Sequence, residues 1–98
     1  MTEYNNIEDK IIDGRILSQN KIKKIRDTLL TNPNKPGLAI VLIGNDPSSH
    51  LYVKLKKSAC EKCNIDFHEY SFNADADEKE IVECIKFLNK DTDTDGIL

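Results

Sequence analysis

The chain has 98 residues, the length of one small domain and too short for two. Hydrophobic residues make up 39% and charged residues 32%, so the composition is that of a globular protein rather than a disordered one. The formal net charge is -3 and the basic residues are spread along the chain, which argues against a nucleic-acid surface. The longest apolar run is too short to cross a membrane, and the N-terminus lacks the apolar core of a signal peptide. We therefore expect a cytoplasmic protein.

The first part of the chain predicts a helix followed by a buried strand. Residues 1–10 are polar and are expected to be flexible, and residues 11–14 to form a short extended piece that ends in a turn. A helix is predicted over about residues 15–30. Three apolar residues are spaced to form its buried stripe: Ile22, Ile25 and Leu29. Residues 38–43 are apolar at every position, which predicts a strand covered on both faces, as in a parallel sheet.

A second helix is predicted directly after this strand. Asp46 can cap the free amides of its first turn, and Pro47 has the φ angle that suits a first helical position. We expect the helix to end near Cys63, with Asn64 in the left-handed conformation that stops many helices.

The remaining residues predict a strand, a helix and the beginning of another strand. Residues 67–72 alternate, which predicts a strand exposed on one side. Asp77 and Glu80 resemble a capping box at the start of the third helix. Its core face is expected to consist of four apolar residues: Ile81, Val82, Ile85 and Leu88. The three carboxylates of the loop 91–95 are interpreted as solvated charge rather than a metal site, and residues 96–98 begin a strand.

Alternating helices and strands favour parallel strands joined by right-handed crossovers. We predict an α/β fold with three layers, α/β/α, and a mostly parallel sheet built from successive βαβ units. Because the chain stops just inside a strand that no helix follows, we expect a sheet that is incomplete at its C-terminal edge, and a piece of a longer protein. Ligands of such sheets bind at the carboxyl ends of the strands, where the turn 44–49 lies.

Tyr52 and Lys56 are the candidate catalytic pair. They are four residues apart on a predicted helix, so the phenol and the amine share one face and can exchange protons. At 100° per residue, Lys56 falls on the side of Ser49, Tyr52 and the cysteines, away from a polar arc formed by the other lysines. A lysine away from the solvated face favours a functional role, although its stem can also simply cover apolar surface.

The three cysteines cannot all pair within one chain. The spacing of Cys60 and Cys63 occurs in redox motifs and in zinc sites. Zinc needs two more ligands, and His50 and His68 have no suitable spacing. Both cysteines lie late in the helix, on its apolar side, so we interpret them as buried, reduced residues and predict no metal.

Several segments, in order and at matching spacing, resemble the N-terminal part of the bifunctional methylenetetrahydrofolate dehydrogenase/methenyltetrahydrofolate cyclohydrolase family. The resemblance covers about residues 11–98. It is carried by Ile12-Asp13-Gly14-Arg15, Pro36-Gly37-Leu38-Ala39, Gly44-Asn45-Asp46-Pro47-Ser48-Ser49, Tyr52-Val53, Lys56, Ala59-Cys60-Glu61, Ile65 and Asp95-Gly96-Ile97-Leu98.

This resemblance implies a cytoplasmic enzyme of one-carbon metabolism, which also serves purine biosynthesis. Such an enzyme oxidises 5,10-methylenetetrahydrofolate with NADP, or NAD in some members, and hydrolyses the methenyl product to 10-formyltetrahydrofolate. Residues 11–98 would be part of its N-terminal tetrahydrofolate-binding catalytic domain. The NADP-binding domain would be absent, since no glycine-rich dinucleotide fingerprint occurs in the chain. The full-length protein would be a homodimer that binds neither nucleic acid nor membrane.

The same resemblance assigns roles to three side chains. Lys56 matches the central catalytic group of the hydrolysis. Tyr52 matches a tyrosine that packs on the pterin and hydrogen-bonds near the lysine. Ser49 matches a substrate-binding serine at the edge of the folate cleft, although a serine in the first turn of a helix can also serve only as a local hydrogen-bonding residue.

Two other readings remain open from the sequence. A Tyr-x-x-x-Lys pair also occurs in short-chain dehydrogenases, where a glycine-rich nucleotide loop precedes it; no such loop precedes Tyr52. The second reading is a non-catalytic α/β module that binds a pterin-like ligand or a partner chain. Loss of folate turnover in Lys56→Ala would favour the enzyme, and binding without turnover would favour the module.

Overall fold

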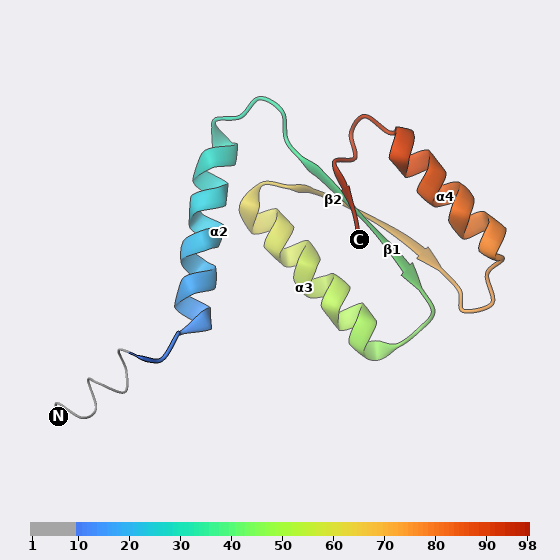
Figure 1. Cartoon of the computed structure of the whole chain (residues 1–98), viewed down its shortest axis with the longest axis horizontal. Helices are drawn as coiled ribbons and strands as arrows, with labels where there is room; N and C mark the ends of the chain where they lie inside the picture. The colour runs from blue at the N-terminus through green and yellow to red at the C-terminus, as the bar shows by residue number, and fades with distance from the viewer. Residues whose placement is uncertain (1–9) are drawn as a thin grey trace.

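The computed structural model describes residues 10–98, and these form an open α/β structure (Figure 1). The expected flexible N-terminus therefore lies outside the described residues, apart from Lys10. The elements are, in chain order, α2 (Gly14–Leu30), β1 (Gly37–Ile43), α3 (Pro47–Cys63), β2 (Asp66–Phe72), α4 (Glu78–Lys90) and β3 (Gly96–Ile97).

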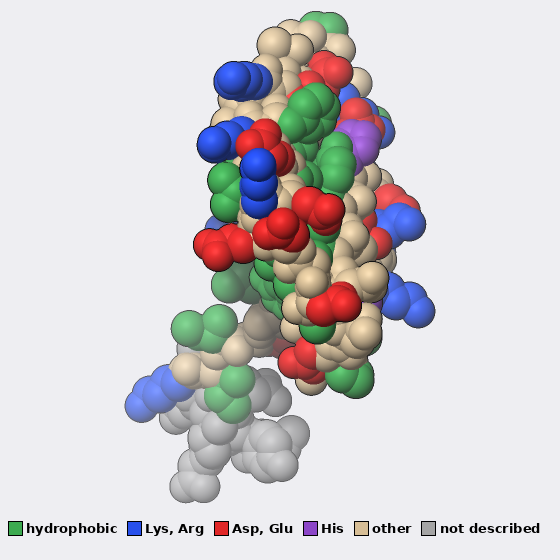
Figure 2. Space-filling view, turned by 90° about the vertical axis from the view of Figure 1, so that its right-hand side faces the viewer, with side chains coloured by type: hydrophobic (Ala, Val, Ile, Leu, Met, Phe, Trp, Pro, Cys, Tyr) green, Lys and Arg blue, Asp and Glu red, His purple; other side chains and the backbone are tan. Residues whose placement is uncertain are grey.

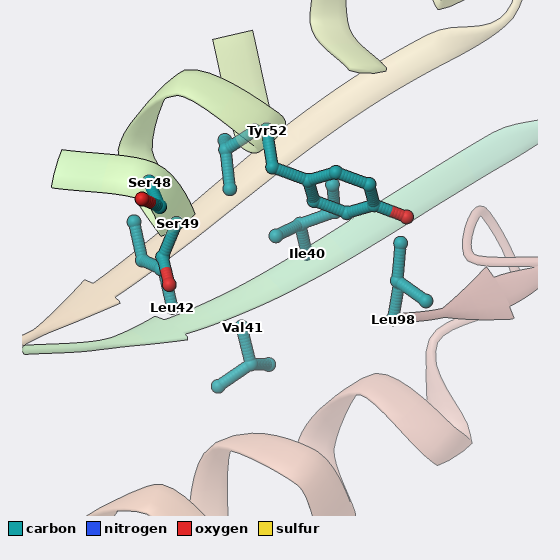
Figure 3. A pocket seen from close by; sticks show the side chains of 8 residues that line it. Ile40, Val41, Leu42, Ser48, Ser49, Tyr52 and Leu98 are labelled. Carbon is teal, nitrogen blue, oxygen red and sulfur yellow. The ribbon is translucent and has the colours of Figure 1, made fainter. Parts of the chain in front are cut away.

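The three strands form one parallel sheet in the order β2-β1-β3. The chain moves from β1 to β2 through α3, and then returns across β1 to β3 through α4. Because right-handed crossovers in opposite directions cover opposite faces, α3 and α4 lie on the two sides of the sheet, as Figure 3 shows. The predicted α/β class, with a parallel sheet between helical layers, is confirmed.

The central strand β1 carries most of the core. Ile40 and Leu42 are buried and pack with Val53 of α3 and with the half-buried Phe67 of β2. Ala39, which projects to the opposite face, is fully buried. The prediction that this strand is covered on both faces is confirmed, except at its last residue, Ile43, which is half exposed.

The boundaries of α3 agree with the sequence signals. The Asp46 carboxylate accepts a hydrogen bond of 2.9 Å from the Ser48 amide, and Pro47 is the first helical residue. Asn64 ends the helix with φ 64° and ψ 42°, which is the left-handed conformation. The predicted start and end of this helix are both confirmed.

The predicted helix over about residues 15–30 is confirmed, and α2 starts one residue earlier than predicted. Residues 11–14 were expected to end in a turn, but Asp13 is the N-cap of the helix and Gly14 is its first residue. The Asp13 carboxylate accepts hydrogen bonds of 3.0 and 3.3 Å from the amides of Arg15 and Ile16. An aspartate at this position satisfies amides that would otherwise lack a partner, so it starts a helix rather than a turn.

The predicted buried stripe of α2 was wrong. Ile25 is 44% exposed, and Ile22 and Leu29 are only half-buried. The helix packs mainly against α3, where the thiol of Cys63 lies 4.0 Å from the carbonyl oxygen of Ile22. A helix with a single main neighbour buries a line of contact rather than a whole apolar face.

On α4, Asp77 caps the helix through the Lys79 amide at 3.1 Å, which confirms the predicted start. The predicted core face is only partly buried: Leu88 is buried, whereas Val82 and Ile85 are more than a third exposed. Figure 2 shows acidic, basic and hydrophobic side chains interspersed on the side of the molecule that carries this helix.

No helix within residues 10–98 has the length and apolar character to span a bilayer.

The edge strand β2 begins at Asp66, close to the prediction. Tyr70 and Phe72 on one face are half-buried, whereas Glu69 and Ser71 on the other are exposed. The predicted one-sided exposure is therefore confirmed for residues 69–72. It does not hold at Phe67, which packs against the core, or at His68, which is exposed.

The acidic loop before β3 has a structural role. One oxygen of the Asp91 carboxylate accepts from the Asp93 amide at 3.1 Å, and the other from the Thr94 hydroxyl at 2.9 Å. Asp95 accepts a 2.9 Å hydrogen bond from the Gly37 amide, which joins the loop to the start of β1. Two of the three carboxylates therefore organise the loop. The interpretation of these carboxylates as solvated charge was incomplete.

Candidate functional site

A cavity of about 320 Å³ lies beside β1, between this strand, the first turns of α3 and the end of the chain after β3 (Figure 3). Its lining combines apolar strand residues with hydroxyl groups from the helix. The lining residues are Ile40, Val41, Leu42, Ser48, Ser49, Tyr52, Val53 and Leu98.

The topology of the sheet explains the position of this cavity. The crossovers that leave β1 and reach β3 lie on opposite faces of the sheet, so their helices diverge where these two strands meet. Such a switch point leaves a crevice at the carboxyl ends of the strands. The cavity lies at the end of β1 that leads into the turn 44–49, as the sequence predicted.

Tyr52 and Lys56 meet as their spacing predicts. The Lys56 ammonium lies over the Tyr52 ring, 5.2 Å from its centroid, which is within the range of a cation–π contact. Tyr52 is 50% exposed and extends over the cavity toward Leu98 (Figure 3). Lys56 is half-buried, whereas its neighbours Lys54 and Lys57 are exposed. The predicted separation of Lys56 from the solvated face is confirmed.

Ser49 also lies where the sequence placed it, half-buried in the cavity wall. Ser48, which lines the cavity beside it, was not singled out; its place in the same helical turn is a signal that could have found it. Leu98 was missed as well. It reaches the site because the Leu98 amide and carbonyl pair with Ala39 and Val41 of β1, a long-range contact that no local pattern reveals.

Cys60 and Cys63 are buried thiols, as predicted, whereas Cys84 is half-buried. Cys60 and Cys63 are free and at most 6% exposed. Burial raises the pKa of the Cys60 thiol, the neighbouring Cys63 adds to this effect, and Lys56 partly opposes it. A thiol with a raised pKa is a poor nucleophile and metal ligand. Within the part of the chain that the structure describes, no three His, Cys, Asp or Glu side chains gather as a metal site would require.

The domain is an open parallel α/β structure with a cavity at its switch point. Two serines and Tyr52 line this cavity, and the Lys56 ammonium lies over the Tyr52 ring. Such an arrangement is typical of domains that bind a small organic ligand. The sequence pattern of the tetrahydrofolate dehydrogenase/cyclohydrolase catalytic domain matches residues 12–98, and the chain belongs to this family. The resemblance inferred from the sequence is thereby confirmed.

Curated relatives agree with this family. The chain is 41% identical over 91 residues to the bifunctional protein FolD of Nautilia profundicola and 40% identical over 95 residues to that of Methanosarcina acetivorans. These matches cover 90% and 93% of this chain but only 32% and 33% of the relatives. The chain thus spans about a third of the length of the curated relatives it matches.

Solved structures show the same fold. The bifunctional FolD enzyme of Campylobacter jejuni has a TM-score of 0.78 at 35% identity, covering 88% of this chain and 32% of that one. The 5,10-methylenetetrahydrofolate dehydrogenase of the silkworm Bombyx mori has a TM-score of 0.84 at 30% identity, covering 90% and 32%. The Trypanosoma brucei enzyme, solved with NADP and an inhibitor, has a TM-score of 0.84 at 22% identity, which shows the fold alone.

Proposed function

We propose that this chain is the substrate side of an enzyme of one-carbon metabolism. The enzyme oxidises 5,10-methylenetetrahydrofolate to 5,10-methenyltetrahydrofolate with NADP, and hydrolyses that product to 10-formyltetrahydrofolate. The observation that carries the proposal is the Lys56–Tyr52 contact at a cavity, in a chain that matches the family's catalytic domain over residues 12–98. Relatives that share about 40% of its residues are bifunctional FolD proteins.

Lys56 is the proposed catalytic group of the hydrolysis. The methenyl carbon belongs to a cationic amidinium, so it is attacked by water once a proton leaves the water molecule. The neutral Lys56 amine takes this proton and returns it to the ring nitrogen that leaves when the ring opens. The remaining hydroxyl proton passes to solvent as the formyl carbonyl forms. Lys56 is half-buried and is not itself part of the cavity wall, but its amine lies beside the ring of Tyr52, which lines the cavity.

Tyr52 and Ser49 are proposed to bind the substrate. The Tyr52 ring offers a flat apolar surface with a hydroxyl at its tip, which suits a pterin with polar edges. The ring also contacts Lys56, so it contributes to catalysis by holding the amine in place. The Ser49 hydroxyl lies in the same cavity wall and is available for a hydrogen bond to the substrate.

We assign no part of the NADP site to residues 10–98. A dinucleotide pyrophosphate binds to free amides at the start of a helix that follows a glycine-rich turn. The turn before α3 has a single glycine, Gly44, and the Asp46 carboxylate already accepts from the Ser48 amide. A carboxylate at this position also repels a phosphate. NADP, or NAD as the alternative, is the cofactor of the intact protein and supplies the hydride acceptor when bound.

We also propose the cellular setting that the family resemblance implies. The protein acts in the cytoplasm as a homodimer, without nucleic-acid or membrane partners. Its product supplies one-carbon units for purine biosynthesis. The charge of -3 and the interspersed charged side chains of Figure 2 support a protein without a polyanion-binding surface.

The Lys56→Ala variant of the full-length protein tests the proposal. We expect hydrolysis of 5,10-methenyltetrahydrofolate to fall by about 100-fold or more, since a positioned acid–base group contributes roughly 10²–10⁴-fold. The circular dichroism spectrum should not change. Lys57→Ala, an exposed neighbour on the same helix, is the control and should keep the wild-type rate. A wild-type rate in Lys56→Ala would contradict the proposal, and wild-type protein that binds this compound without turnover would favour the binding module.

A further inference from the structure

The turn between β1 and α3 is held at both backbone polar groups of Gly44. Its amide donates a 2.9 Å hydrogen bond to the carbonyl of Phe72 at the end of β2. Its carbonyl oxygen lies 3.2 Å from Nε2 of His50. Because a carbonyl only accepts, His50 must donate through Nε2–H in this contact.

The His50 contact differs from the other hydrogen bonds at the start of α3. The bonds from the Ser48 amide to the Asp46 carboxylate and from the His50 amide to the Asp46 carbonyl form within the helix start itself. These two hydrogen bonds do not depend on how the helix is oriented relative to the sheet. The His50 ring instead joins the helix to Gly44, which is itself bonded to the sheet through Phe72. This contact therefore ties the first turn to the sheet at a point before Val53, which packs against Ile40 and Leu42.

We propose that His50 is a positioning residue that holds Ser49 and Tyr52 at the cavity wall; this inference rests on the proposed function of the cavity. His50 follows Ser49 directly and precedes Tyr52 by two residues. Lys56 lies one turn further along α3, next to the part of the helix that Val53 and Cys60 anchor in the core. His50 thus acts on substrate binding through Ser49 and Tyr52, and on the hydrolytic step only indirectly, through the Tyr52 ring that contacts Lys56.

The test compares His50→Ala with His50→Gln in the intact protein, with Lys54→Ala as a surface control on the same helix. The substrate is 5,10-methenyltetrahydrofolate. We expect His50→Ala to raise KM about three- to tenfold, the factor that corresponds to one hydrogen bond, with kcat within about twofold of wild type. Glutamine places an N–H donor at a similar reach, so His50→Gln should restore KM. A purely structural role would instead lower the melting temperature and leave KM unchanged.

A second measurement does not depend on turnover. Nitrogen NMR of the histidine rings should show the Nε2–H form for His50, and the amide resonances of Ser49 and Tyr52 should shift in His50→Ala and return in His50→Gln. An unchanged KM with unshifted resonances in His50→Ala would overturn the inference, as would equal effects of Ala and Gln. If the wild-type protein hydrolyses nothing, the proposed function fails, and the positioning role is then decided by the resonances alone.

Discussion

Single side chains in this protein take their roles from one or two specific neighbours. Lys56 has the Tyr52 ring one turn before it and the Cys60 thiol one turn after it. The thiol is buried and its pKa is raised, so it offers the ammonium no anionic partner near neutral pH. Tyr52 is thus the contact that orients the amine. The same dependence on close neighbours appears at Asp91, where the charge of a carboxylate is stabilised by donors from its own loop.

At Asp91, the Asp93 amide and the Thr94 hydroxyl lower the pKa of the carboxyl, and His68 adds to this effect. Because the pKa in the folded state is below the unfolded value of about 3.9, the ionised carboxylate stabilises the fold above that pH. This contribution is lost as the pH falls through the folded pKa. We expect Asp91→Asn to lower the free energy of unfolding at pH 7 and to differ less from wild type near pH 3.

Urea unfolding at the two pH values measures this difference. Asp93→Asn is the control, since the hydrogen bonds of this loop use the amide of Asp93 and the carboxylate of Asp91. It should show a smaller loss at pH 7. If Asp91→Asn lowered the free energy of unfolding equally at pH 7 and pH 3, this would contradict the conclusion that the ionised Asp91 carboxylate stabilises the loop.

At the scale of the elements, the helix ends are set by local chemistry and the helix faces by their neighbours. Asp13, Asp46 and Asp77 all cap helices through their carboxylates. The burial of a helix face follows no such local rule. The apolar residues of α2 remain largely exposed because its main neighbour is α3, whereas α3 buries Val53 and both of its cysteines against the sheet and α2.

The end of α3 provides a prediction at this scale. Asn64 has φ 64°, and a left-handed conformation costs an ordinary L-residue about 1–2 kcal/mol. We expect Asn64→Ala to lower the free energy of unfolding by about 1 kcal/mol and Asn64→Gly to be neutral or stabilising. Chemical denaturation of both variants measures this. Equal stability of the alanine and glycine variants would show that the helix end does not depend on this backbone conformation.

At the scale of the whole molecule, the sheet is completed by contacts between residues more than fifty positions apart. The Gly37 amide donates to the Asp95 carboxylate, and the Asp95 amide donates to the Gly37 carbonyl. These bonds bring β3 next to β1, and with it Leu98 into the cavity wall. The cavity therefore depends on the closure of the chain at Gly37.

Gly37 tolerates no side chain at this closure. A Cβ atom there would collide with the backbone carbonyl of Asp93. We expect Gly37→Ala to lower the free energy of unfolding by about 1–3 kcal/mol, the usual cost of overpacking, and to weaken ligand binding in the cavity. Gly14→Ala is the matched control. A Cβ there meets no atom within 4 Å, and alanine suits a helix better than glycine, so stability should be kept or raised. Equal melting temperatures for the two variants would contradict this account of the closure.

The sequence by itself determined the order of the elements, the ends of α3, the parallel sheet and the shared face of Tyr52 and Lys56. The helix ends and the shared face follow from interactions between residues a few positions apart, which appear as caps and spacing. The parallel sheet was inferred from the order of the elements and the apolar run of β1, although its strand pairs join distant residues. Only the tertiary structure decided that the predicted stripe of α2 is half-buried at most, that His50 bonds to the turn and that Leu98 joins the cavity wall. These features depend on contacts between segments that are far apart in the sequence. Local sequence patterns do not show which of these segments come into contact.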